Sequence, residues 1–239
     1  MQEAVIDRRV HVVVNGEAKV LRVSELRDCP YLVLLGEPGI GKSSVLRKEA
    51  TDEGGTVVTC REVMNGTSLA GQSTAYLDAL DEYRTTGDRK DKLHRLATAI
   101  SATPGLRWRL TCRAEDWRDA ADLAAVRRVA QGSEIVAAHL LPLDEDEAAA
   151  VLLALGEVDP SEFIDQARRR AAEAFLESPL SLRLLRSALE GAGGQWPATR
   201  FDLYTMAVEQ LAHEWDEQRT TDPRPAASQI IEVAGTLSL

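Results

Sequence analysis

Cysteine and histidine are scarce in this chain, whose 239 residues include three cysteines and four histidines. The cysteines are odd in number and lie far apart, at Cys29, Cys60 and Cys112. They form neither a metal-ligand spacing nor a disulfide framework, and the histidines match no metal or nucleophile pattern. These absences argue against a zinc module or a disulfide-stapled secreted domain. A reduced, cytoplasmic setting is therefore expected.

Long apolar runs and an excess of basic residues are also missing. No stretch approaches the length of a membrane span, and residues 1–9 lack the apolar core of a signal peptide. Lysine and arginine number 28 against 38 acidic residues, which gives a formal net charge of −10. This balance argues against a dedicated nucleic-acid binder. We therefore expect neither a membrane nor a nucleic acid as partner of this module.

One glycine-rich segment carries the most information. It follows the wholly apolar run 31–35, which is typical of a buried parallel strand, and it precedes residues 43–50, which indicate a helix. Strand, glycine loop and helix are the context of a phosphate-binding loop. The predicted nucleotide-binding residues are Gly36, Glu37, Pro38, Gly39, Ile40, Gly41, Lys42, Ser43 and Ser44.

The chemistry of this loop follows from its residue types. Glycines let backbone N–H groups turn inward around a phosphate, and the helix N-terminus adds partial positive charge. Lys42 would reach the β- and γ-phosphates, and the Ser43 hydroxyl would ligate Mg²⁺. The loop predicts nucleotide binding more firmly than hydrolysis, because a loop that binds need not cleave.

The rest of the chain predicts two kinds of structure in succession. Asn15-Gly16 predicts the turn of a β-hairpin, and later apolar runs predict a series of strands with a crossover helix over 93–100. After Leu143 the strand patterns disappear and helical patterns follow one another. The expected hairpin strands are 10–14 and 17–23, the further strands are 31–35, 56–60, 74–77, 107–112 and 135–140, and the later helices are 144–155, 160–177, 179–189 and 201–219.

These elements predict an α/β fold, in which a parallel P-loop sheet is flanked by helices and followed by a smaller all-α domain. Residues 1–30 are expected to form an N-terminal hairpin and lead-in. Residues 31–143 would form the nucleotide-binding domain and residues 144–239 the helical domain.

A second acidic motif supports the first. Asp78 follows an apolar run, at the carboxyl end of a strand expected beside the phosphate loop, where the metal-shell carboxylate of P-loop NTPases lies. Asp78 would therefore help to hold Mg²⁺. A second acid, either Asp81 or Glu82, would orient the attacking water or take its proton. In isolation the motif could equally be a solvated acidic turn before a helix.

Several segments together resemble one family of ATPases. Residues 75–82 resemble the Walker B motif of NACHT ATPases, in which a small residue follows the metal aspartate and further acids come shortly after. Residues 110–113 resemble their sensor 1, a strand that ends in an arginine at the γ-phosphate. Residues 178–180 resemble the helical-domain proline near the adenine. The resemblance spans roughly residues 31–219 and implies a NACHT-like ATPase module of the STAND class, from a bacterial signalling or antiphage defence protein.

The resemblance implies specific roles. Arg113 would be the sensor, Pro179 would lie near the adenine, and the cofactors would be ATP or ADP with Mg²⁺. The guanine-reading motif N-K-x-D is absent, which also leaves adenine favoured. From Lys42 to Asp78 there are 36 positions (78 − 42), fewer than expected for a NACHT domain, and the chain is expected to continue past Leu239.

The implied function is a molecular switch. It would bind ATP, hydrolyse it slowly, and form a homo-oligomer when an unknown protein trigger activates it. Two alternatives remain open from the sequence. One is an AAA+-type remodelling ATPase with steady turnover, and the other is a non-catalytic scaffold whose nucleotide is structural.

Overall fold

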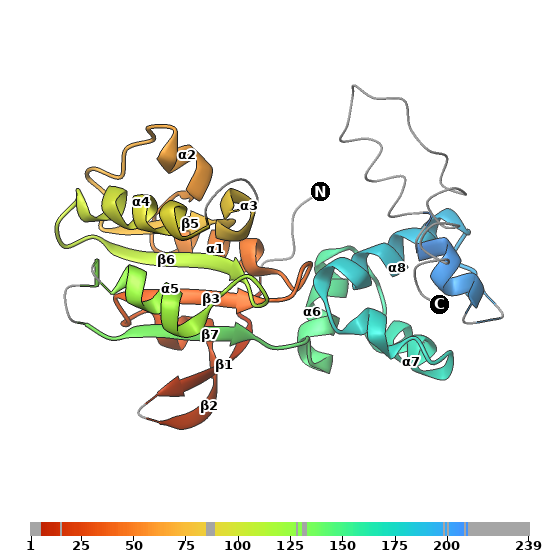
Figure 1. Cartoon of the computed structure of the whole chain (residues 1–239). Coiled ribbons are helices and arrows are strands. Elements are labelled where there is room, and N and C mark those ends of the chain that lie inside the picture. The colour runs from red at the N-terminus through yellow and green to blue at the C-terminus, as the bar shows by residue number, and fades with distance from the viewer. Residues whose placement is uncertain are drawn as a thin grey trace, which may run out of the picture. The chain divides into compact units, whose positions relative to one another are not determined.

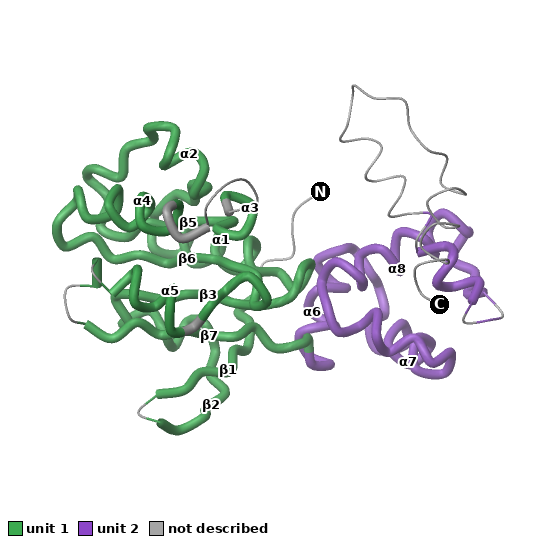
Figure 2. The backbone as a smooth tube through the Cα atoms, in the orientation of Figure 1, with its two compact units in different colours: residues 1–143 green, residues 144–239 purple. Residues whose placement is uncertain are grey.

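The structure is a computed structural model that describes residues 6–14, 16–84, 89–127, 129–130, 133–197, 199, 201–207 and 209. The chain divides into two compact units, residues 1–143 and residues 144–239 (Figure 2). Among the described residues, no helix is both long and apolar enough to cross a membrane.

Unit 1 is built on a seven-stranded sheet with the order β2-β1-β7-β3-β6-β5-β4 (Figure 1). The five strands from β7 to β4 run parallel, as predicted, and the α/β fold class is confirmed. The predicted hairpin also forms, and β1 pairs antiparallel with β7, so the hairpin extends the sheet and makes it mixed. The strands are β1 Arg9–Val14, β2 Glu17–Arg22, β3 Tyr31–Gly36, β4 Val57–Thr59, β5 Thr74–Asp78, β6 Arg107–Arg113 and β7 Ile135–Leu140.

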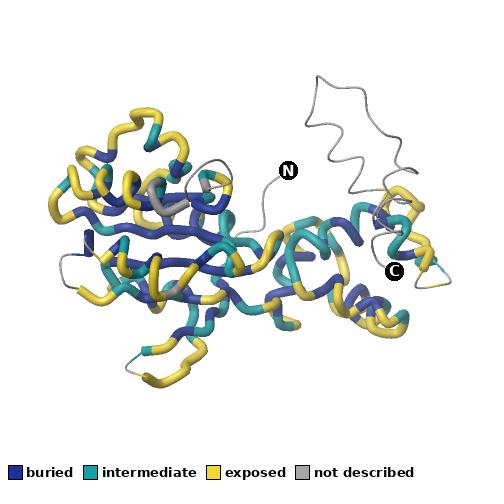
Figure 3. Tube along the Cα trace, viewed as in Figure 1, coloured by how far each residue is buried: buried dark blue, intermediate teal, exposed yellow. Residues whose placement is uncertain are grey.

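Helices cover both faces of the parallel strands. All six residues of β3 are buried (Figure 3), because alternate side chains enter different apolar clusters. Val33 and Leu35 pack with β5, β6 and α4, while Leu32 and Leu34 pack with β1, η1 and β7. The helices of this unit are η1 Val23–Leu26, α1 Lys42–Asp52, α2 Cys60–Met64, α3 Leu80–Arg84, α4 Arg89–Ser101 and α5 Asp119–Val126.

The predicted strand 56–60 is too long at its end, because Cys60 already belongs to α2. Thr59 caps that helix: its hydroxyl accepts a hydrogen bond from the Glu62 N–H, and the Glu62 carboxylate accepts one from the Thr59 N–H. The T-x-x-E pattern of a capping box was the sequence signal for this helix start.

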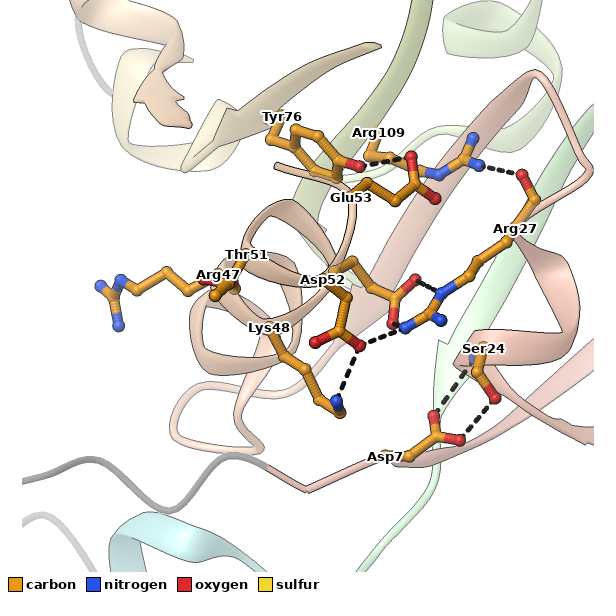
Figure 4. A network of polar contacts seen from close by, with 11 residues as sticks. Asp7, Ser24, Arg27, Arg47, Lys48, Thr51, Asp52, Glu53, Tyr76 and Arg109 are labelled. Carbon is orange, nitrogen blue, oxygen red and sulfur yellow. Dashed lines mark hydrogen bonds and ion pairs between the residues drawn. The ribbon is translucent and has the colours of Figure 1, made fainter. Parts of the chain in front are cut away.

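A polar network fixes the far end of α1 (Figure 4). Arg27, which follows η1, donates two hydrogen bonds of 2.9 and 2.8 Å to the buried carboxylate of Glu49, and it also pairs with Asp52. Asp52 in turn accepts a hydrogen bond of 2.8 Å from Lys48. Paired donation from a planar guanidinium to a carboxylate sets direction as well as distance. The network therefore holds α1, whose first residue is Lys42, in one orientation.

Unit 2 is helical, with α6 Glu145–Ala154, α7 Pro160–Arg169, η2 Glu173–Leu176 and α8 Pro179–Gly191. The predicted helix 160–177 is too long, because α7 ends at Arg169 and Ala171 turns the chain with a left-handed φ of 52°. No glycine or proline marks this break in the sequence. Of the predicted helix 201–219, residues 201–207 and 209 are described and helical, and the remaining positions lie outside the described residues.

Candidate functional site

The predicted site residues of unit 1 gather at one edge of the sheet. Gly36, the last residue of β3, is in register with Arg113, the last residue of β6. Asp78, the last residue of β5, is in register with Thr59 at the end of β4. Carboxyl ends of parallel strands meet at the same edge, which is where open α/β sheets bind ligands.

The position of Asp78 corrects one expectation. The strand that carries Asp78 is not beside the loop strand β3, because β6 lies between β3 and β5. At the usual spacing between neighbouring strands, β5 therefore lies about 10 Å from β3. The inserted strand brings Arg113 between the loop and Asp78. Sequence order alone does not reveal this, because the chain passes through α4 before it returns as β6.

The loop owes its shape to three glycines. Gly39 and Gly41 have φ values of 76° and 102°, in the left-handed region that favours glycine. A Cβ on Gly36 would come 2.8 Å from the Cγ2 atom of Ile40 and 3.4 Å from the Cβ atom of Leu140. Ile40 itself is buried in the apolar cluster below the loop. The loop is therefore anchored by Ile40, while Glu37 and Pro38 are exposed.

Lys42 is held against the start of the same loop. Its Nζ donates hydrogen bonds of 2.8 Å to the Gly36 carbonyl and 2.9 Å to the Glu37 carbonyl. Partial burial lowers the pKa of Lys42, and the negative charge of Asp81 opposes that shift while the charge of Arg113 adds to it. Ser43 and Ser44 follow in the first turn of α1, where both are half-buried.

Asp78 is positioned by a neighbour on β6. The Thr111 hydroxyl donates a hydrogen bond of 2.5 Å to Asp78 Oδ1 and accepts one of 3.0 Å from the Ala79 N–H. Thr111 is almost completely buried, and Ala79 has a left-handed φ of 59°, which is unusual for a residue with a Cβ. The chain therefore turns sharply directly after Asp78, and Thr111 supports that turn.

Asp81 and Arg113 form a two-point contact. Arg113 Nε lies 2.9 Å from Asp81 Oδ2, and the Arg113 backbone N–H donates a hydrogen bond of 3.2 Å to Asp81 Oδ1. Asp81 is buried, the Arg113 side chain is 41% exposed, and the neighbouring acid Glu82 is exposed. The two acids that the sequence did not distinguish therefore differ in their surroundings. Asp81 is buried and contacts Arg113 through both carboxylate oxygens, whereas Glu82 is exposed.

The oxygen donors fit a magnesium site. Both hydrogen bonds that the structure describes for the Asp78 carboxylate fall on Oδ1, so Oδ2 would be the oxygen available to a metal-bound water. No group of three or more His, Cys, Asp or Glu side chains suited to hold a metal occurs among the described residues. Mg²⁺ beside a nucleotide needs no such group, because phosphates and waters supply most of its ligands. The Ser43 hydroxyl and Asp78 match that donor set.

Pro179 belongs to unit 2, where it is the first residue of α8 after the N-cap Ser178. Proline favours that position for helix initiation alone. Sequence reasoning assigned no role to Thr111 or to Arg8, whose buried guanidinium contacts the loop. For Thr111 a signal existed, because polar residues alternate along β6 at Arg107, Arg109, Thr111 and Arg113 in a strand buried on both faces.

No family model matches the sequence, and no curated protein matches it significantly. Distant structural likenesses exist. The Orc1 protein of Aeropyrum pernix, solved in complex with DNA, is 18% identical over 75% of this chain and 59% of its own, with a TM-score of 0.45. Domain III of the Thermotoga maritima replication initiation protein DnaA is 15% identical over 80% and 88%, with a TM-score of 0.47.

The RuvB Holliday junction branch migration motor of Thermotoga maritima is 14% identical over 77% of this chain and 61% of its own, with a TM-score of 0.42. The chain thus spans about three fifths of the lengths of the Orc1 and RuvB chains. With identities below 20% and TM-scores below 0.5, the functional assignment has to come from the residues of the chain itself.

Proposed function

We propose that this chain is the ATP-binding module of a STAND-type molecular switch, similar to NACHT ATPases. The observation that carries the proposal is the convergence of a glycine loop, Lys42, Asp78 and the Asp81–Arg113 pair at one edge of a parallel sheet. A lysine, a hydroxyl, a metal-shell carboxylate and an arginine recur in P-loop enzymes of phosphoryl transfer, because that catalysis consists mainly of positioning and charge stabilisation.

Each residue has a proposed task. Loop amides and Lys42 would bind the β- and γ-phosphates, while Ser43 and Asp78 would hold Mg²⁺, which would supply positive charge to stabilise the charged phosphates. Arg113 reads the γ-phosphate. Glu82 orients the attacking water, because it is exposed to solvent whereas Asp81 is buried.

The Asp81–Arg113 pair supplies a way to sense nucleotide state. A guanidinium can form paired hydrogen bonds with a carboxylate or with a phosphate. The γ-phosphate of ATP would compete with Asp81 for the Arg113 side chain, while ADP would leave the pair intact. Because Arg113 ends β6, a change of partner there would alter the loop that follows this strand. Activation by an unknown protein trigger, homo-oligomerisation and a role in bacterial defence or signalling rest on the resemblance alone.

The proposal is tested by identifying the nucleotide released when the purified protein is denatured, and by measuring ATP turnover. Tightly held ADP with slow turnover supports the switch. Steady, rapid turnover would instead favour an AAA+-type remodelling ATPase. A protein that releases nucleotide but shows no property dependent on it would be a scaffold. A protein that neither holds nor binds adenine nucleotide would contradict all three readings.

A further inference from the structure

Arg8 is among the largest fully buried side chains of unit 1, with 1% exposure. It lies just before β1, far in sequence from the residues it contacts. Its Nη1 donates a hydrogen bond of 2.6 Å to the Ile40 carbonyl in the phosphate loop, and its Nη2 donates one of 2.5 Å to the Leu141 carbonyl directly after β7. One guanidinium therefore ties the loop to the end of a neighbouring strand.

The backbone around Arg8 is fixed on both sides. Before it, the Asp7 carboxylate accepts hydrogen bonds of 2.6 Å from the Ser24 hydroxyl and 3.2 Å from the Ser24 N–H (Figure 4). The Arg8 carbonyl accepts one from the Val23 N–H at 3.0 Å, and the Arg9 carbonyl accepts one from the Leu141 N–H at 3.1 Å. The guanidinium is thus placed by rigid surroundings, as a group that positions another group must be.

The contact with Ile40 has a consequence for its neighbour Gly41. The Ile40 carbonyl and the Gly41 N–H belong to one planar trans peptide group, in which C=O and N–H point in opposite directions. Holding the carbonyl on the Arg8 side therefore turns the Gly41 N–H to the opposite side of the loop backbone. A charged donor on the carbonyl also polarises the peptide and makes its N–H a stronger donor.

We propose that Arg8 is a positioning residue for the phosphate loop, which aims and strengthens the Gly41 N–H as a ligand of a nucleotide phosphate. This inference rests on the proposed nucleotide function. It adds a residue outside the loop motif, placed 32 positions before the carbonyl that it holds. Arg8 does not touch the nucleotide in this account and acts through one peptide group.

The test compares Arg8→Met and Arg8→Lys with Arg9→Met. Arg9 is the matched control, because its Nη2 donates to the Pro142 carbonyl at 3.2 Å and the substitution removes the same charge one residue away. In nitrogen-15 spectra of the protein without nucleotide, the Gly41 amide resonance should move in both Arg8 variants and stay in place in Arg9→Met. By calorimetry, Arg8→Met should bind ADP about tenfold more weakly. This is the effect of losing roughly one hydrogen bond to a charged group, here the one from the Gly41 N–H to a phosphate.

Arg8→Lys keeps a charge but cannot span both carbonyls, so it should also shift the Gly41 resonance and weaken ADP binding; this variant decides the matter if Arg8→Met does not fold. An unmoved Gly41 resonance with unchanged ADP affinity in a folded Arg8 variant overturns the inference. If the wild-type protein binds no adenine nucleotide, the proposed function fails, and the Gly41 resonance still reports whether Arg8 sets the peptide orientation.

Discussion

Asp81 holds Arg113 at two points, through the side-chain Nε at 2.9 Å and the backbone N–H at 3.2 Å. The carboxylate is buried, while the guanidinium is 41% exposed. An exposed partner limits how much such an ion pair stabilises the fold, because water screens it. The backbone contact adds direction, since it fixes the end of β6. The pair therefore controls where Arg113 points more than it stabilises unit 1.

Because Asp81 is buried against Arg113 and Glu82 is exposed, substitutions of these two neighbouring acids should have different effects. Glu82→Gln should leave ATP affinity unchanged and lower turnover by about 100-fold or more, the usual contribution of a positioned acid–base group. Turnover under saturating Mg²⁺–ATP measures it. The control is Glu115→Gln, because Glu115 is another acid near Arg113, at 3.9 Å, to which no role in hydrolysis is assigned. Equal turnover in the Glu82 and Glu115 variants would remove Glu82 from the mechanism.

The lowered pKa of Lys42 predicts a pH dependence of binding. Burial disfavours the ammonium in the free protein, whereas a bound phosphate favours it, so the pKa of Lys42 should rise when nucleotide binds. Between these two pKa values binding takes up a proton, and affinity should fall as pH rises, by up to about tenfold per pH unit. The affinity should begin to fall at a pH below 10.5, which is the ordinary pKa of a lysine.

Calorimetry of ADP binding across this pH range measures the effect, and Lys42→Arg is the control, because an arginine stays charged throughout. The affinity of the Lys42→Arg protein for ADP should not change with pH over this range. The same slope in both proteins would mean that Lys42 is not the titrating group.

Gly36→Ala tests the packing under the loop. The added Cβ would come 2.8 Å from Ile40 Cγ2, so Ile40 and the loop must shift. We expect a loss of about 1–3 kcal/mol in the free energy of unfolding, as for other overpacked sites, together with weaker nucleotide binding. Urea denaturation measures the first effect. Gly191→Ala is the control, because nothing lies within 4 Å of its Cβ position and it ends α8. Equal stability of the two variants would contradict the close packing.

The sequence predicts those features whose signals are local. The glycine loop lies between its strand and helix, and the helices expected from residues 144 and 179 begin at Glu145 and Pro179. Features that depend on residues far apart in the chain are not predicted from the sequence. The insertion of β6 between β3 and β5 is one, and the Thr111–Asp78 hydrogen bond, across 33 positions, is another. The early end of α7 is not predicted for a different reason, since Ala171 adopts a left-handed conformation that its residue type does not suggest.

The central claim is that Lys42, Ser43 and Asp78 act on the phosphates and metal of one nucleotide. Calorimetric titration of Mg²⁺–ATP into the wild-type protein and into Lys42→Ala, each first stripped of nucleotide, tests it most directly. We expect saturable binding by the wild type and no detectable binding by Lys42→Ala, with both proteins folded by circular dichroism. Equal ATP affinity in the two proteins would contradict it.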